Sequence, residues 1–386
     1  SESVKMSKLR KPIVQTRRDA WIEINLNNVE HNIKELKKLT RPETKFMAVV
    51  KADAYGHGSD MSAATLIASG VDMLGVASVD EGIQLRAAGI TVPILVLGTT
   101  PDWAFVSAAE NNIQVSIFDD EHINSCIHTY NRLGCKQEVH VKVDTGMHRI
   151  GINHEVASEF INKVLNTPEI ELQGVFSHLA CAENREITAC QVKRWENVIN
   201  AIPNRQNLVI HLSNTAGIIS NSDLNYDMVR AGIGIYGLYP DLPGDVAVVP
   251  DFKQVMSLKG RISHIKEISE DSGVSYGYSY KADKERVKIA TIPIGYADGV
   301  PRSLSNRIFG IIKGQKVQQV GNITMDQMMF DITNVNNVSN GDIITLLGED
   351  NGAFISIDEW AKLLGTINYE VTCRLRVRLP RVYTRK

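Results

Sequence analysis

Short apolar runs rich in β-branched residues recur between about residues 45 and 240, at intervals of some twenty to forty residues. Between them lie segments such as 63–67 and 161–165, in which apolar residues have helical spacing. Eight strands alternating with helices are typical of an α/β fold, the (β/α)8 barrel of the TIM type. The runs predicted as strands are 46–51, 73–78, 94–98, 114–118, 139–144, 172–178, 208–213 and 226–230.

The pattern changes after residue 239, where Pro240, Pro243 and Pro250 punctuate the chain and the alternation stops. The segment 357–364, with Ser356 as its N-cap, is the one clear helix predicted beyond this point. The other runs there have strand character and are separated by turns, which predicts a mostly antiparallel β domain. These strand-like runs are 255–265, 287–292, 311–312, 316–320, 328–332 and 343–347.

The chain has 386 residues, too many for one ordinary core, so its length also favours two domains. Its 42 basic and 44 acidic residues leave a net charge of −2, which argues against nucleic acid and favours a small-molecule partner. Five cysteines, with no C-x-x-C pair and no histidines at zinc spacing, indicate neither a disulfide scaffold nor a metal site. This cysteine usage predicts a reducing, cytoplasmic setting.

The first twenty residues form a basic segment that begins with serine and contains little acidic balance. One interpretation is a disordered leader. The other is a linker on the cytoplasmic side of a membrane domain that precedes this chain in a longer protein. We therefore divide the sequence into a leader or linker at 1–20, a barrel at 21–240 and a β domain at 241–386.

Polar and ionisable residues stand where the predicted barrel strands end, which is where such barrels place their catalytic groups. Lys51 ends the first strand directly after an apolar run. Burial would lower its pKa from about 10.4 and favour the neutral, nucleophilic amine. A lysine that merely extends to solvent from a strand end is the alternative. The other polar residues at strand ends are Lys142, Asp144, His178, Asn214, Thr215 and Arg230.

The segment from Arg230 to Gly234 contains Gly232 and Gly234, and glycines allow backbone N–H groups to approach an anion closely. Such a turn alone is a weak signal. Together with the strand-end amine of Lys51 and the hydroxyl of Thr215, it describes a site for a phosphorylated aldehyde that condenses with an amine. Pyridoxal 5'-phosphate is the cofactor that this chemistry favours.

Six ordered motifs carry a resemblance that extends from Trp21 to Tyr383: 48–57, 141–149, 228–237, 274–277, 292–299 and 321–327. With these motifs the chain resembles the alanine racemase family of fold-type III pyridoxal-phosphate enzymes. The resemblance implies a barrel followed by a β domain, and a head-to-tail homodimer whose active sites are shared between subunits. It also implies racemisation of a small amino acid, which supplies D-amino acids for cell-wall precursors.

The resemblance assigns two opposed bases to this chain. Lys51 matches the lysine that carries the cofactor as a Schiff base and acts on the D enantiomer. Tyr276 matches the base for the L enantiomer, supplied by the partner subunit. One base removes the α proton and the other returns a proton to the opposite face, which is what racemisation requires. A half-buried aromatic residue on a strand edge is the structural alternative for Tyr276.

Further roles are implied residue by residue. Arg230 matches the arginine that faces the pyridine nitrogen, with His178 in support. Arg149 and the backbone N–H of Met325 match the contacts to the substrate carboxylate. Lys142 matches a lysine that many members carry as a carbamate. The remaining matches lie around the phosphate or close over the cofactor and substrate, and they are Tyr55, Asn214, Thr215, Gly232, Ile233 and Tyr296.

One position departs from the family pattern. Val377 stands where many alanine racemases have a tyrosine near the phosphate. Loss of the ring and hydroxyl enlarges the pocket, and a change of this size is worth only about 1–3 kcal/mol, so specificity would relax from alanine towards serine. The serine racemases of vancomycin resistance resemble this family and carry such a domain behind a membrane domain.

Two other functions are compatible with the barrel. Amino-acid decarboxylases of related fold usually place a glutamate against the pyridine nitrogen, so Arg230 argues against decarboxylation. Non-enzymatic cofactor carriers of the single-domain type lack the β domain that holds Tyr276 and Met325 in this chain. Racemisation is therefore the leading hypothesis.

Overall fold

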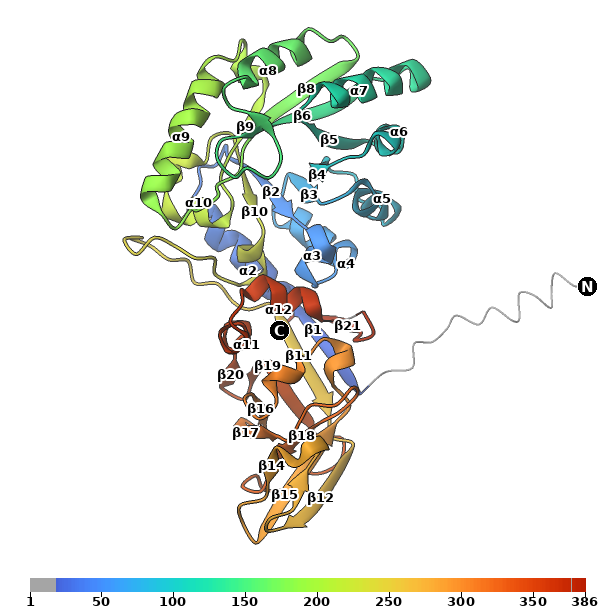
Figure 1. The fold of residues 1–386 in the computed structure, drawn as a ribbon, viewed down its shortest axis with the longest axis vertical. Coiled ribbons are helices and arrows are strands. Elements are labelled where there is room, and N and C mark those ends of the chain that lie inside the picture. The colour runs from blue at the N-terminus through green and yellow to red at the C-terminus, as the bar shows by residue number, and fades with distance from the viewer. Residues whose placement is uncertain (1–18, 376) are drawn as a thin grey trace, which may run out of the picture. The chain divides into compact units, whose positions relative to one another are not determined.

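The computed structural model describes residues 19–375 and 377–386. They form two compact units, one of residues 25–255 with 384–386 and the other of residues 19–24 with 256–383 (Figure 1). The predicted leader at 1–20 lies outside the described residues except for its last two positions. No helix in the described part of the chain is long and apolar enough to cross a membrane.

The larger unit is the predicted barrel, and all eight expected strands are present. The sheet closes because β10 pairs in parallel with β2, which places Arg230 opposite Met47, and because β5 pairs with β6. A two-residue strand, β7 (Ile152–Asn153), adds to the edge of β6. The barrel strands are β2 (Lys45–Val49), β3 (Met73–Val76), β4 (Ile94–Thr99), β5 (Ile113–Ile117), β6 (Gln137–Asp144), β8 (Ile170–Phe176), β9 (Val209–His211) and β10 (Met228–Ala231).

Helices connect the strands, and several of them begin after a residue whose side chain satisfies one of the first N–H groups. The side chains of Asn25, Ser78 and Asp119 each accept a hydrogen bond from the backbone of the helix that follows. These caps fix where the connecting helices start. The helices are α2 (Leu26–Lys37), α4 (Ser59–Ala68), α5 (Val79–Ala87), α6 (Phe105–Glu110), α7 (Asp120–Leu133), α8 (Ala157–Leu165), α9 (Arg185–Asn200) and α10 (Thr215–Ser220).

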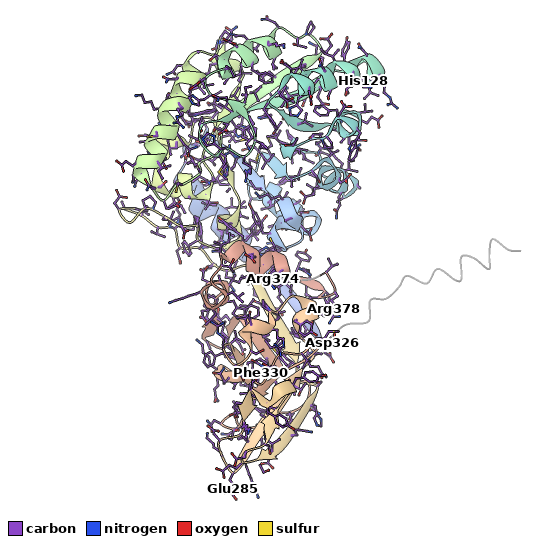
Figure 2. The ribbon with its side chains drawn as sticks, in the orientation of Figure 1. His128, Glu285, Asp326, Phe330, Arg374 and Arg378 are labelled. Atoms are coloured by element: carbon purple, nitrogen blue, oxygen red, sulfur yellow. The ribbon has the colours of Figure 1, made fainter. Side chains whose placement is uncertain are left out.

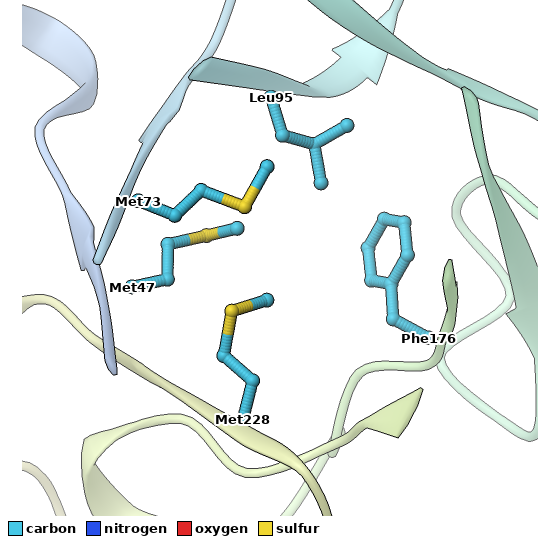
Figure 3. Close-up of a cluster of buried hydrophobic side chains, with 5 residues drawn as sticks. All are labelled: Met47, Met73, Leu95, Phe176 and Met228. Carbon is cyan, nitrogen blue, oxygen red and sulfur yellow. The ribbon is translucent and has the colours of Figure 1, made fainter. Parts of the chain in front are cut away.

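Apolar side chains fill part of the barrel interior (Figure 3). Three of them are methionines, whose unbranched side chains adapt to an irregular space. Because this interior is packed, the barrel is a core and its chemistry is confined to the strand ends. The cluster consists of Met47, Met73, Leu95, Phe176 and Met228.

The smaller unit is the predicted antiparallel β domain. Its main sheet has the order β12-β15-β18-β17-β16-β19-β11-β1-β21, with β20 paired to β19. The strands are β1 (Ala20–Asn25), β11 (Met256–Arg261), β12 (His264–Ser269), β15 (Arg286–Ile292), β16 (Phe309–Ile312), β17 (Gln315–Val320), β18 (Met328–Asp331), β19 (Ile343–Asp350), β20 (Ala353–Ile355) and β21 (Arg381–Thr384). A separate hairpin joins β13 (Gly273–Val274) to β14 (Tyr280–Lys281).

Three details of the smaller unit differ from the sequence-based expectation. The run 255–265 forms two strands, β11 and β12, which pair with different neighbours. The helix α11 (Ile357–Leu364) starts at Ser356 as expected, in a capping box with Glu359. A second helix, α12 (Asn368–Arg374), was not predicted, and it has no side-chain cap to signal its start. The third difference concerns residues 21–24, which were predicted to belong to the barrel. Residues 20–24 pair with β11 in antiparallel fashion, so β1 belongs to the sheet of the smaller unit.

Candidate active site

Lys51 lies at the carboxyl end of β2 and opens the short helical segment α3 (Lys51–Tyr55). The next four residues, from Ala52 to Tyr55, have φ angles of 51, 53, 55 and 54°. None of them is glycine, and the left-handed conformation costs an L-residue roughly 1–2 kcal/mol. A run of such residues persists only where the surroundings impose it, and strain of this kind clusters at functional sites.

Hydrogen bonds and a stacked ring hold this strained turn. The Asp53 carbonyl accepts from the Gly58 N–H at 2.8 Å, and the Asp53 carboxylate accepts from the Ser59 N–H at 2.9 Å. The buried His57 ring stacks on Tyr236 with centroids 4.4 Å apart. Tyr55 lies on the same turn, so the turn positions the amine of Lys51 and the phenol of Tyr55 together.

A cradle of backbone amides and hydroxyls lies where β10 ends. The Thr215 hydroxyl accepts hydrogen bonds from the Gly232 N–H at 3.2 Å and the Gly234 N–H at 3.4 Å. A Cβ on Gly232 would stand 2.6 Å from the Tyr55 hydroxyl, so only glycine leaves that hydroxyl in place. Asn214 caps α10 directly before Thr215. The Thr215 hydroxyl accepts both bonds and still has its own proton to donate, which suits an anion such as a phosphate.

Lys142 is an uncommon buried cation on β6, with only 4% of its surface exposed. Its amine lies 5.6 Å from the centre of the Phe176 ring. Burial first, and then the positive charges of Arg149, Arg230 and Lys51, lower the pKa of Lys142 from 10.5 to about 7. Because these charges act on Lys142, the four basic side chains lie close together at one rim of the barrel.

Arg230 is held rigidly at the end of β10. Its guanidinium donates to His211 Nδ1 at 2.8 Å, and to the carbonyls of Ser177 at 2.6 Å and Leu212 at 3.0 Å. It also lies 5.2 Å from the Phe176 ring centre. Burial lowers the pKa of Arg230 to about 9, so the side chain is still protonated at neutral pH.

The histidine that supports Arg230 is His211, and the expectation of support from His178 was wrong. His178 lies near the same charges. Burial first, and then the charges of Arg230 and Lys142, lower the pKa of His178 well below 6.5. The side chain hydrogen-bonded to Arg230, however, is the fully buried imidazole of His211. Sequence reasoning missed His211, although a histidine at the end of an apolar strand run was a usable signal.

In the smaller unit, Tyr276, Tyr296 and Met325 lie on turns that hydrogen-bond to one another. The Asn322 side chain donates to the Tyr276 carbonyl at 2.8 Å. The Tyr296 N–H donates to the Thr324 carbonyl at 3.0 Å. Tyr276 is 75% exposed and Met325 is 54% exposed within this chain. Large side chains presented in this way are available to a ligand or a second protein surface.

Two ion pairs made by Arg378 hold the turn that carries Met325 in place (Figure 2). Arg378 Nε contacts the fully buried Asp298 carboxylate at 2.5 Å, and Arg378 Nη2 contacts Asp326 at 2.6 Å. Asp298 also accepts from the Gly295 N–H at 3.0 Å. Arg378 therefore ties the residue after Met325 to the short helix that begins at Tyr296.

A cavity of about 1230 Å³ lies at the other end of the barrel, where β2 and β9 begin. Its lining mixes basic side chains such as Arg41 and Arg205 with acidic ones such as Glu43 and Asp223. In barrels of this type that end contributes stability, whereas the chemistry is at the carboxyl ends. We therefore place the candidate site at the Lys51 rim.

Both units of the chain match known protein families. Residues 24–240 match the family described as alanine racemase, N-terminal domain, and residues 255–383 match the alanine racemase, C-terminal domain. The chain belongs to the alanine racemase family. It is 42% identical over 372 residues to the alanine racemase of a Nostoc species, covering 94% of this chain and 95% of that protein.

Solved alanine racemase structures have the same fold. The alanine racemase of Clostridium difficile 630 superposes with a TM-score of 0.90 at 38% identity, covering 96% of this chain and 97% of the other. The histidine racemase of Leuconostoc mesenteroides gives a TM-score of 0.87 at 29% identity, covering 96% and 99%. The fold therefore serves racemases that are named for different amino acids.

Members of the alanine racemase family are pyridoxal-phosphate enzymes, and the cradle can be tested against that cofactor. The space over Gly232 that a Cβ would fill, together with the hydroxyls of Thr215 and Tyr55, fits a phosphate. The amine of Lys51 and the guanidinium of Arg230 lie at the carboxyl ends of neighbouring strands. The larger unit thus carries the predicted residues at 51, 55, 142, 149, 178, 214, 215, 230, 232 and 233, and the smaller unit those at 276, 296 and 325.

Proposed function

We propose that this chain interconverts L- and D-alanine with pyridoxal 5'-phosphate, using Lys51 and Tyr276 as opposed bases. The observation that carries the proposal is the strained turn that presents Lys51 at a strand end beside the Gly232 cradle. Within a family whose curated members are named alanine racemases, that combination supports this reaction above decarboxylation or cofactor storage.

Each part of the cofactor has residues suited to it. The backbone N–H of Ile233 and the hydroxyls of Thr215 and Tyr55 would bind the phosphate. Gly232 would leave room for it, and Asn214 would hold Thr215 in place. Lys51 would hold the aldehyde carbon, and Arg230 would face the pyridine nitrogen. When bound, pyridoxal phosphate supplies an electron sink that stabilises negative charge at the substrate α carbon. Because Arg230 retains its proton, it does not protonate the ring, which limits that sink and disfavours transamination.

Proton movement belongs to the two bases. Tyr276 Oη takes the α proton from the L enantiomer, and Lys51 Nζ returns a proton to the opposite face; the roles reverse for the D enantiomer. Positive charge at the rim would stabilise the phenolate form of this base. Lys51 and Arg149 would supply that charge.

The substrate carboxylate would be bound by Arg149 and by the N–H of Met325, with Tyr296 closing over it. Lys142 is suited to modification, because a pKa of about 7 leaves much of its amine neutral at physiological pH. The neutral amine attacks carbon dioxide, forming an N–C bond and releasing one proton. The resulting carbamate anion would orient Arg149 and remove an unfavourable buried cation.

A homodimer would complete the site. Tyr276 and Met325 are exposed within this chain, as expected if each serves the barrel of the partner subunit. An arrangement of that kind buries large side chains that otherwise face water. In the cell, the D-alanine product would enter cell-wall precursors in the cytoplasm.

Serine is a second candidate substrate, favoured by Val377. This side chain is 92% exposed within the described chain and has neither the ring nor the hydroxyl of a tyrosine. The additional hydroxyl of serine is then easier to accommodate. Discrimination between alanine and serine by a pocket change of this size is about 10- to 200-fold at most.

The test is incubation of the purified, cofactor-loaded protein with L-alanine or L-serine in heavy water. We expect the D enantiomer to accumulate together with deuterium at the α carbon, and the ratio of the two rates measures the preference. Lys51→Ala is the control and should abolish both signals. If neither amino acid is racemised while the cofactor is bound, the proposal fails.

A further inference from the structure

A chain of hydrogen bonds leads from Arg230 into the barrel interior. Arg230 contacts His211 Nδ1 at 2.8 Å, and His211 Nε2 contacts His140 Nδ1 at 3.0 Å. His140 Nε2 contacts Gln114 Oε1 at 2.9 Å. At the surface end, Gln114 Nε2 donates to the exposed Glu138 carboxylate at 3.0 Å. The residues come from β10, β9, β6 and β5, so this row of hydrogen bonds crosses half of the barrel.

The partners determine the direction of every hydrogen bond in this chain. Arg230 can only donate, so His211 Nδ1 is the acceptor and its proton lies on Nε2. His140 Nδ1 must then accept, which puts the His140 proton on Nε2, facing the Gln114 carbonyl oxygen. The Gln114 amide cannot turn over, because its oxygen would then face the Glu138 carboxylate. All donors therefore point away from Arg230.

Both imidazoles are neutral, as this pattern requires. His211 is fully buried and His140 nearly so. Burial first, and then the charge of Arg230, lower the pKa of His140 to about 3. Burial, Arg230 and His140 lower the pKa of His211 well below 6.5. Each ring then has one N–H and one acceptor nitrogen, and each is used.

The strand β8 lies between His140 and His211 and is adapted to let them meet. Gly174 stands in β8, and a Cβ there would lie 2.6 Å from His140 Nδ1 and 2.5 Å from the Val209 carbonyl oxygen. A glycine inside a strand often marks such a close approach. The two imidazole rings consequently meet edge to face with centroids 5.1 Å apart.

We propose that His140 and Gln114 are positioning residues that act through His211 on Arg230. Their hydrogen bonds keep the His211 proton on Nε2, and so keep Nδ1 as an acceptor for the guanidinium. If the proton moved to Nδ1, two N–H donors would face each other at the Arg230 contact and the guanidinium would be displaced. The kinetic consequence rests on the proposed function, in which Arg230 faces the cofactor ring. The assignment of the His211 proton to Nε2 does not depend on that function.

The test is nitrogen NMR of the loaded enzyme labelled with ¹⁵N-histidine, in which protonated and unprotonated ring nitrogens are distinguished. A His211→Gln variant assigns the signals. We expect His211 to carry its proton on Nε2 in the native protein, and to show a mixture of tautomers in Gln114→Met, which removes the acceptor at nearly constant volume. The double variant Gln114→Glu with Glu138→Gln exchanges the two side chains, keeps an oxygen facing His140 and should restore the native tautomer.

Two results would overturn the inference. One is a His211 proton on Nδ1 in the native protein, and this result does not depend on whether any variant folds. The other is an unchanged His211 tautomer in folded Gln114→Met. Kinetics give the second readout: we expect kcat to fall about tenfold in Gln114→Met with an unchanged KM, and to recover in the double variant. A native enzyme that has the expected tautomer but no racemase activity would refute the proposed function instead.

Discussion

The hydroxyl of Tyr55 stands 2.6 Å from the position that a Cβ on Gly232 would occupy. This close approach makes glycine necessary there, because a Cβ and the hydroxyl cannot both occupy the space. The same hydroxyl and the Thr215 hydroxyl define the anion cradle. A side chain at residue 232 therefore acts directly on the proposed phosphate site.

Gly232→Ala should weaken cofactor binding by at least about tenfold, or ~1.4 kcal/mol. The added methyl group displaces the Tyr55 hydroxyl and fills space needed by the phosphate. Titration of the cofactor-free protein with pyridoxal phosphate, followed by absorbance, measures the dissociation constant. Gly244→Ala is the matched control, because a Cβ on Gly244 meets nothing within 4 Å. Equal affinities of the two variants would contradict the cradle.

Tyr276→Phe should slow α-proton exchange from L-alanine by about 10²- to 10⁴-fold, the usual range for a missing general base, and affect exchange from D-alanine much less. The reason is that Lys51 remains available for the D enantiomer. Proton NMR in heavy water measures both exchange rates on the same enzyme. Tyr278→Phe removes a neighbouring exposed phenol from the same turn and serves as the control. An equal loss for both enantiomers would count against the two-base assignment.

Lys142→Met should raise the melting temperature by about 2 °C or more in carbon dioxide-free buffer below pH 7. The pKa of Lys142 is lowered from 10.5 to about 7, so the unfolded chain binds more protons between these values and stability rises with pH there. The burial cost of the charged amine is complete below pH 7 and vanishes above about pH 10.5. The gain from Lys142→Met should therefore shrink across this window.

Differential scanning fluorimetry at closely spaced pH values measures this trend. Lys193→Met replaces an exposed lysine on α9 and should show no such pH dependence. A gain from Lys142→Met that stays constant from pH 6 to pH 10 would contradict the assigned cause. Adding bicarbonate to the native protein should reduce the gain if Lys142 takes up carbon dioxide, and mass spectrometry under mild conditions detects the adduct.

Arg378→Met should raise the KM for alanine about tenfold and lower the melting temperature. Without the guanidinium, the buried Asp298 carboxylate loses its cationic partner and the turn carrying Met325 is no longer fastened. Arg374→Met is the control, since Arg374 contacts only the exposed Glu370 at a distance of 3.9 Å among the ion pairs of the described residues (Figure 2). A KM equal to that of the control would refute the positioning role.

The larger unit could be predicted closely because its signals are local. Apolar runs of strand length alternate with helical spacing, and caps such as Ser78 and Asp119 mark the helix starts. The short helix α12 and the division of the run 255–265 into two strands escaped prediction. Neither has a strong local signal, since pairing with different neighbours separates β11 from β12 and no side chain caps α12.

In the candidate site, too, some features could be predicted from the sequence and others could not. The positions of Lys51, Thr215 and Arg230 at one rim could be predicted because strand ends converge there and the motifs are contiguous in sequence. The partner of Arg230 was not identifiable. Choosing between His178 and His211 requires knowing which side chain points into the barrel at the level of the guanidinium, and that depends on the stagger of the closed sheet.

By itself, the sequence determined the order of strands and helices, the two kinds of domain, the family and the positions of the basic groups. Those properties depend on periodicity and on short motifs. Only the tertiary structure decided that Tyr55 lies over Gly232, that Arg378 joins Asp298 to Asp326, and that Arg230 leads through His211 to Gln114. Contacts of this kind join residues distant in sequence, and they exist only once the closed barrel and the twisted sheet bring particular side chains to the same level.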